Sequence, residues 1–284
     1  MMPIKLSFNP SNSQDSMVNT FKFAVLLGAT LLATGCFNKT TTKAICEKSP
    51  ELCQGLNTDG WCKAERREVI LKRQNYANES SELNQYYILR SFIDYKQCIE
   101  IASNVEPIHA KHKKTERVEG FITAVNEIER IDKATQHSEL PQLAYYHWLV
   151  NGDLEAKERF LAIEGTSAEN DPELTLALAT YYFERDSEKT IRLLYKTLRL
   201  QKDTLPNPSI YNSLTTLYLK TKNYQAAYIW MQVAHRLGEY PINESWIDRQ
   251  HKFSPEEKDK LQEMAGEVID DIKNFQFQSG DYNM

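Results

Sequence analysis

The sequence predicts an all-α protein, in which an array of helical hairpins follows a cysteine-bearing helical segment. Apolar residues recur at helical spacing, and no stretch shows the sustained alternation of a half-buried strand. The 284 residues include only 10 Gly, about half the usual share, which disfavours a turn-rich β protein. Helix-start signals at Ser138, Asp171 and Asn207 are 33 and 36 residues apart, a period typical of helix–turn–helix arrays.

The composition disfavours a chain that is disordered throughout and a protein that binds nucleic acid. Hydrophobic residues make up 41% of the chain and charged residues 26%, so there is enough apolar material for a core. The formal net charge is −5, whereas a protein that neutralises phosphates needs a basic face, so we expect no nucleic-acid partner.

An export signal opens the chain. Residues 23–34 form an apolar run of twelve residues after Lys22. A membrane-spanning helix needs about 20 residues, so this run is typical of the apolar part of a signal peptide. The run ends at Cys36, directly after small residues, in a pattern that resembles the bacterial lipobox. The resemblance implies cleavage before Cys36 and acylation of that residue. A plain secretory signal with an incidental cysteine, or a short buried helix, is the alternative.

The signal peptide is expected over residues 1–35, with a lipidated tether over 36–49. Residues 1–16 are polar and do not fit the start of a signal, so Met17 is a candidate true start. In the lipoprotein family Asp after the lipidated Cys often marks inner-membrane retention. Phe37 stands there instead, which favours the outer membrane and a chain that faces the periplasm.

Four cysteines remain after Cys36, and an even number in an exported chain indicates two disulfides. An antiparallel pair of helices would bring Cys62 and Cys98 together. We therefore favour Cys62–Cys98, with Cys46–Cys53 closing a small loop, among three possible pairings. The alternative is a zinc site, but the spacings match no paired CxxC pattern.

Three helices are expected in the cysteine-bearing region, residues 50–136. The first covers about residues 64–76. The second starts near Glu82 and has one apolar face, formed by Ile88, Phe92, Tyr95, Ile99 and Ala102. The third places on one side Val118, Phe121, Ile122, Val125 and Ile128.

Residues 137–252 carry the repeated helix starts, each with a capping side chain before a Pro. The third unit resembles a tetratricopeptide repeat, through Tyr211, Leu214, Leu217, Tyr218, Ala227, Met231 and Ala234. The second expected repeat resembles it more weakly, because Ile191 and Leu198 stand where small residues belong. The first expected repeat is one residue short of the family spacing. The alternative is an irregular helical bundle.

The tetratricopeptide resemblance implies a concave surface formed by the first helix of each expected repeat. The corresponding positions are Gln142, Tyr146, Leu149, Leu176, Thr180, Phe183, Asn212, Thr216 and Leu219. They mix apolar and hydrogen-bonding groups without charge, which would suit an extended peptide or a helix of another protein. The alternative is that a neighbouring segment of the same chain fills this groove.

A capping helix is expected over residues 253–276, followed by a frayed tail over 277–284. Ser254 precedes Pro255, and Glu257 stands at the third helical position, as in a capping box. An apolar stripe follows, formed by Leu261, Met264, Ala265, Val268, Ile269 and Ile272. Such a helix would cover the last exposed face of the array.

No motif of a known catalytic or phosphate-binding site occurs, so we assign no catalytic residue, metal or cofactor. His109 and His112 precede a basic run, which could bind a metal or anionic lipid headgroups but is more often a solvated helix start. Glu164, Glu169 and Asp171 lie close in sequence, as acids in a loop often do.

The whole pattern resembles a family of uncharacterised proteobacterial lipoproteins, which share the lipobox, the cysteine-bearing helical segment and a helical-repeat half. That family has no assigned activity. The leading hypothesis is therefore a lipid-anchored adaptor that binds an envelope protein or peptide. The alternatives are an enzyme that acts on peptidoglycan and a structural lipoprotein without a specific ligand.

Overall fold

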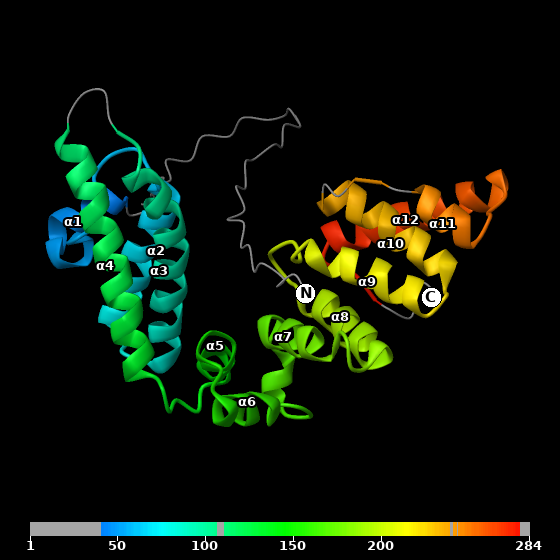
Figure 1. Cartoon of the computed structure of the whole chain (residues 1–284), viewed down its shortest axis with the longest axis horizontal. Helices are drawn as coiled ribbons and strands as arrows, with labels where there is room; N and C mark the ends of the chain where they lie inside the picture. The colour runs from blue at the N-terminus through cyan, green and yellow to red at the C-terminus, as the bar shows by residue number, and fades with distance from the viewer. Residues whose placement is uncertain (1–40, 107–110, 239–240, 243, 279–284) are drawn as a thin grey trace, which may run out of the picture. The chain divides into compact units, whose positions relative to one another are not determined.

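The computed structural model of the protein describes residues 41–106, 111–238, 241–242 and 244–278 (Figure 1). The all-α prediction is confirmed over these residues, which form helices and no strand. None of the described helices is both long and apolar enough to cross a membrane. The chain divides after Ala162 into two compact units. We call the described residues 41–162 the first unit and residues 163–278 the second unit.

The first unit is built on three long helices, α2, α3 and α4, with α3 in contact with both of the others (Figure 1). The predicted face of α3 is confirmed, because all five of its expected apolar residues are buried. The elements of this unit are α1 (Thr42–Lys48), the 3-10 helix η1 (Pro50–Cys53), α2 (Lys63–Asn78), α3 (Glu82–Ser103), α4 (His112–Ala134), α5 (Pro141–Asn151) and α6 (Leu154–Leu161).

The face that α4 buries agrees only in part with the predicted one. Phe121 and Ile128 pack against the core as expected. By contrast, Val118 and Ile122 are 38% and 51% exposed. The fully buried stripe lies beside them and consists of Arg117, Gly120, Ala124 and Ile131. Small residues at Gly120 and Ala124 let α4 approach α3 closely, and this close approach decides which stripe faces the core.

The tether expected over residues 36–49 contains a helix in its second half. Thr41 caps α1 by accepting a hydrogen bond from the backbone N–H of Ala44. Ile45 is 2% exposed and belongs to the core of the first unit. This buried side chain and the pairing of Cys46 with Cys53 together hold a segment that is short and polar. Residues 36–40 lie outside the described residues.

The division between the two units also differs from the boundary expected at residue 137. Leu143 and Tyr146 of α5 belong to the core of the first unit, and α5 contacts both α3 and α6. The first expected repeat is therefore packed with the cysteine-bearing region, up to Ala162.

The second unit consists of the helix pairs α7–α8 and α9–α10, and α12 packs against α10. Its largest fully buried side chain is Trp230, whose indole N–H donates to the Tyr195 hydroxyl at 3.1 Å. The elements are η2 (Ser167–Asn170), α7 (Pro172–Tyr182), α8 (Ser187–Leu200), α9 (Ser209–Lys220), α10 (Tyr224–Gly238), α11 (Glu244–Gln250) and α12 (Pro255–Lys273).

The helix starts agree with the predicted caps at two places. Asp171 accepts hydrogen bonds from the backbone N–H groups of Glu173 and Leu174, and Ser254 forms a complete capping box with Glu257. By contrast, neither α5 nor α9 has a side-chain cap. Ser138 instead accepts from the N–H of Leu140, and Asn207 from that of Ser209, each holding the turn before its helix.

The chain remains ordered beyond the expected capping helix. Phe277, which was expected to begin a frayed tail, is 2% exposed. Its ring lies 5.8 Å from that of Tyr195 and 6.1 Å from that of Trp230, measured between centroids. Aromatic packing therefore extends the ordered chain past the end of α12, while residues 279–284 lie outside the described residues.

Candidate functional site

The predicted groove positions of the second unit lie on α7 and α9, or directly after α7. Leu176, Thr180 and Phe183 are half-buried and line a hollow between α7, α8 and α9, together with Ser209 and Ser213. On its α7 side the Thr180 hydroxyl donates to the Leu176 carbonyl oxygen at 2.9 Å, and the α9 side carries two further hydroxyl groups.

The three predicted positions on α9 are more open to solvent. Asn212 and Thr216 are exposed, and Leu219 is half-buried. The Thr216 hydroxyl donates to the Asn212 carbonyl oxygen at 3.0 Å, which fixes the rotamer of this threonine. The Asn212 side chain is then the exposed hydrogen-bonding group of this set.

The predicted groove positions of α5 belong to the first unit and do not form a comparable surface. Tyr146 is 9% exposed and lies in the core. Burial, together with the nearby Asp132 carboxylate, raises the pKa of Tyr146 to about 12. The expectation that Tyr146 lines a groove is therefore wrong. Gln142 is half-buried and Leu149 is 51% exposed.

A second candidate region is the loop between η1 and α2, residues 54–62, which we call the 54–62 loop. Covalent bonds hold both of its ends. Cys53 pairs with Cys46 across a Cα–Cα distance of 5.7 Å, and Cys62 pairs with Cys98 of α3 across 5.8 Å. This is the pairing that the sequence favours.

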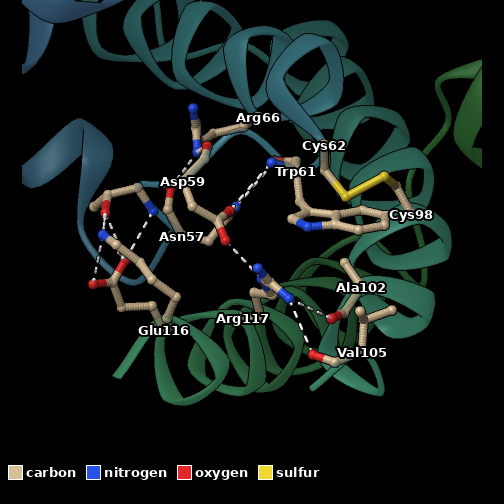
Figure 2. Close-up of polar contacts among 12 residues, drawn as sticks. Asn57, Asp59, Trp61, Cys62, Arg66, Cys98, Ala102, Val105, Glu116 and Arg117 are labelled. Carbon is tan, nitrogen blue, oxygen red and sulfur yellow. Dashed lines mark hydrogen bonds and ion pairs between the residues drawn. A yellow bond between two sulfur atoms is a disulfide. The ribbon is translucent and has the colours of Figure 1, made fainter. Parts of the chain in front are cut away.

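The middle of the 54–62 loop is fixed by buried hydrogen bonds (Figure 2). Asn57 is 1% exposed, and its side-chain oxygen accepts from the Tyr95 hydroxyl at 2.8 Å. One terminal nitrogen of Arg66 donates to the carbonyl oxygens of Asn57 and Asp59, at 2.6 and 2.7 Å. The Asn57 side-chain N–H groups donate within the loop, to the Asp59 carboxylate and the Trp61 carbonyl oxygen. These bonds, together with those to α2 and α3, keep an irregular segment in one conformation.

Asp59 connects the 54–62 loop to α4. Its carboxylate accepts from the Arg117 guanidinium at 2.6 Å, and both side chains are nearly buried. Burial alone would raise the pKa of Asp59, but hydrogen bonds from Arg117, Asn57 and the Trp61 backbone lower it below the ordinary value. Trp61 is 42% exposed, and its ring centroid lies 5.4 Å from the Arg117 guanidinium carbon.

The basic run at the start of α4 is partly engaged with this loop. Lys113 donates to the Thr58 hydroxyl at 2.7 Å and forms an ion pair with Glu116 at 3.1 Å. Lys114 forms an ion pair with Glu106. His112 is exposed, and His109 lies outside the described residues. Intramolecular contacts thus neutralise two of the lysines that a lipid surface would need.

A cleft of about 550 Å³ opens beside the 54–62 loop, between that loop, α2 and α4. Gln54 and Gly55 form its loop wall, Arg73 and Tyr76 come from α2, and Thr123, Glu127 and Arg130 come from α4. Gly55 has a φ of +74°, and a Cβ built on it would lie 2.5 Å from the Thr123 hydroxyl oxygen. Only glycine fits where the loop meets α4.

One buried cluster has residue types that occur in nucleophilic catalysis. His147 is fully buried, with its Nε2 3.0 Å from the Thr135 hydroxyl and its Nδ1 3.4 Å from the Asp132 carboxylate. However, Thr135 is 2% exposed and its hydroxyl already donates to the Ile131 carbonyl oxygen. No substrate can reach this hydroxyl without opening the core, so the cluster has a structural role.

The other candidate sites of the sequence are also engaged. The Cys62 and Cys98 sulfurs lie near Glu65, but sulfurs joined in a disulfide offer no thiolate to a metal. Glu164 forms an ion pair with Lys189 at 2.6 Å, and Glu169 one with Lys196 at 2.8 Å.

Sequence reasoning missed the 54–62 loop and its cleft. The signal was present, because residues 54–60 (QGLNTDG) gather turn-forming residues between two cysteines. The cleft itself could not be found this way, because its walls come from segments some 70 residues apart.

The described residues thus define an all-helical protein with a cysteine-paired, tightly fixed loop in its first unit. The chain belongs to a family described as "Protein of unknown function (DUF2989)", which matches residues 33–232 and so spans both units. This match supports the resemblance to a family of uncharacterised proteins. No curated protein matches the chain, and no solved structure matches it either.

Proposed function

We propose that this protein is a lipid-anchored adaptor of the bacterial cell envelope, which faces the periplasm and binds an envelope protein through its helical pairs. The observation that carries the proposal is the uncharged α7–α9 surface of the second unit, defined by Leu176, Thr180, Phe183, Asn212 and Thr216. Three of these residues line a small hollow of about 10 Å³, and the other two are exposed.

The proposal includes a tetratricopeptide-like arrangement of the helix pairs. Two features support it. Ala227 and Ala234 of α10 are buried, as expected of small residues at helix contacts. The Tyr218 hydroxyl of α9 lies 2.7 Å from the Tyr195 hydroxyl of α8, so this tyrosine connects one pair to the preceding one.

The membrane anchor is the acylated Cys36, and the outer membrane is the favoured location. The sequence pattern before Cys36 supports this part of the proposal. Two cysteine pairs at disulfide distance fit an oxidising compartment. Mass spectrometry of the mature N-terminus tests the anchor, with Cys36→Ser as the variant that should leave the chain unacylated and outside the membrane fraction.

The adaptor role is tested by placing a photo-crosslinking residue at Thr216 in cells. The matched control position is Glu267, which is exposed on α12 of the same unit. We expect one reproducible protein adduct from position 216 and none from 267, and we expect Phe183→Ala to reduce the adduct. An absence of adducts at 216, or equal adducts at both positions, would count against the adaptor role. Release of fragments from purified murein sacculi would favour the enzyme alternative instead.

A further inference from the structure

The cleft beside the 54–62 loop is large enough for part of a peptide. Its volume of about 550 Å³ falls within the range of ligand-binding pockets, about 300–1,000 Å³. Ala77 and the mostly buried Leu52 and Ile88 form the apolar part of the lining, and Gln54, Thr123 and Tyr76 provide hydrogen-bonding groups. An inorganic anion would fill only a small part of this space. The lining therefore suits a ligand with both a backbone and side chains.

Arg73 is a charged group of the cleft that makes no ion pair with any residue that the structure describes. It is half-buried, and its terminal nitrogen donates to the carbonyl oxygens of Leu52 and Gln54, both at 3.1 Å. Its guanidinium carbon lies 4.9 Å from the Phe92 ring centroid. Among the described residues no carboxylate forms an ion pair with it. Burial lowers the pKa of Arg73, and the nearby Arg130 charge adds to this shift, although the Glu127 carboxylate opposes it.

Arg130 and Glu127 stand on the α4 wall of the cleft. Two nitrogens of Arg130 donate to one Glu127 oxygen, at 3.2 and 2.9 Å. Glu127 is therefore engaged with Arg130, and it acts on Arg73 only as a nearby charge. Glu51 also lines the cleft and is exposed, whereas Arg73 and Glu127 are both half-buried. The Arg73 guanidinium, which makes no ion pair in the described part of the chain, lies on the α2 wall of the cleft.

We propose that this cleft binds a short extended peptide segment and that Arg73 receives a carboxylate of that peptide. The carboxylate would take the place of the missing anion, and the backbone would lie along Gln54 and Thr123. The preformed loop supports binding, because the two cysteine pairs and the Asn57 and Asp59 contacts hold the Gln54 wall in place before a ligand arrives. The site lies in the first unit and is independent of the α7–α9 surface.

Isothermal titration of the purified full chain in detergent tests the proposal with three peptides. N-acetyl-Ala-Leu-Leu has a carboxylate only at its chain end, and N-acetyl-Ala-Glu-Leu-amide has one only on a side chain. N-acetyl-Ala-Leu-Leu-amide has none. At least one acidic peptide should bind about tenfold more tightly than the neutral one, and the stronger of the two identifies the source of the carboxylate. Equal binding of all three peptides, or no binding of any, would overturn the proposal.

Three variants locate the site. Arg73→Met should abolish the preference for the acidic peptide. Glu127→Gln should strengthen acidic-peptide binding severalfold, because it removes a competing negative charge from the cleft. Arg249 is an exposed residue of α11 in the second unit, and Arg249→Gln should leave the binding of all three peptides unchanged. If Arg73→Met does not fold, the Glu127→Gln result decides, since a gain in affinity cannot come from unfolding. Unchanged or weaker binding by Glu127→Gln would refute the assignment of the site.

Discussion

Arg117 of α4 and Asp59 of the 54–62 loop form a nearly buried ion pair, with Nε and Oδ2 separated by 2.6 Å. A terminal nitrogen of Arg117 also donates to the carbonyl oxygens of Ala102 and Val105, at 3.3 and 3.1 Å (Figure 2). The Ala102 carbonyl lies in the last turn of α3 and also accepts from the backbone N–H of Val105 at 3.2 Å, and the Val105 carbonyl lies just beyond that helix. One guanidinium thus connects the loop, the end of α3 and the start of α4.

We expect Asp59→Asn to destabilise the first unit by about 3 kcal/mol, because it leaves a buried guanidinium without its counter-charge. Chemical denaturation followed by circular dichroism measures the change. Glu129→Gln is the matched control, since Glu129 and Lys133 form an exposed ion pair on the same helix. The control should not differ measurably from the native chain. Similar effects of the two substitutions would mean that the buried ion pair contributes no more to stability than the exposed one.

We expect Gly120→Ala to destabilise the protein by about 1–3 kcal/mol, the usual cost of overpacking. A Cβ at Gly120 would lie 2.5 Å from the Tyr95 hydroxyl oxygen, and Tyr95 holds Asn57 in place. Gly266→Ala is the control, because a Cβ there meets nothing within 4 Å. In a helix this control should stabilise by about 0.5–1 kcal/mol. Thermal melts of the two variants should shift in opposite directions, and shifts in the same direction would contradict the packing argument.

Acidification should destabilise the first unit through His147. Burial lowers the pKa of His147 below its ordinary value of 6.5, although the Asp132 and Asp153 carboxylates oppose this shift and Arg159 adds to it. Below about pH 6.5 the unfolded chain therefore binds a proton that the folded chain does not. The free energy of unfolding should fall as the pH drops through this range, by at most about 1.4 kcal/mol per pH unit.

Urea unfolding at pH 7.0, 6.0 and 5.5 measures this dependence, with His147→Gln as the comparison. The variant should be less stable at pH 7.0 but should show a shallower loss on acidification. Parallel pH profiles of the native chain and the variant would show that other groups cause the loss.

Removing the Cys62–Cys98 pair should cost more stability than removing Cys46–Cys53. The first pair spans 36 residues and the second only 7, and a longer closed loop restricts the unfolded chain more. We expect a loss of about 2–4 kcal/mol for the double substitution of Cys62 and Cys98 by Ser, under oxidising conditions. Denaturation of the two double variants compares them, and peptide mapping of the native chain tests the pairing. An equal loss for both pairs would argue against this loop-length explanation.

The buried face and the ends of a helix could be predicted where residues of that helix alone decide them. The α3 stripe followed from apolar spacing, and the α12 capping box from residues within one turn, because both depend on nearby positions. The same reasoning succeeded only in part on α4. Phe121 and Ile128 pack against the core. However, Val118 and Ile122 are exposed and a stripe containing Arg117 and Gly120 is buried. Gly120 is buried because Tyr95, 25 residues earlier, reaches into the space beside it.

The sequence by itself determined the helical class and the final cap, since local spacing and residue type encode them, and it favoured the cysteine pairing through an expected antiparallel pair of helices. The tertiary structure decided that Tyr146 is a core residue, that the 54–62 loop is fixed in one conformation, and that Arg73 faces a cleft. Those outcomes depend on contacts between residues distant in the chain, such as Asp59 with Arg117. No local pattern specifies such contacts, because they form only when separate helices pack together.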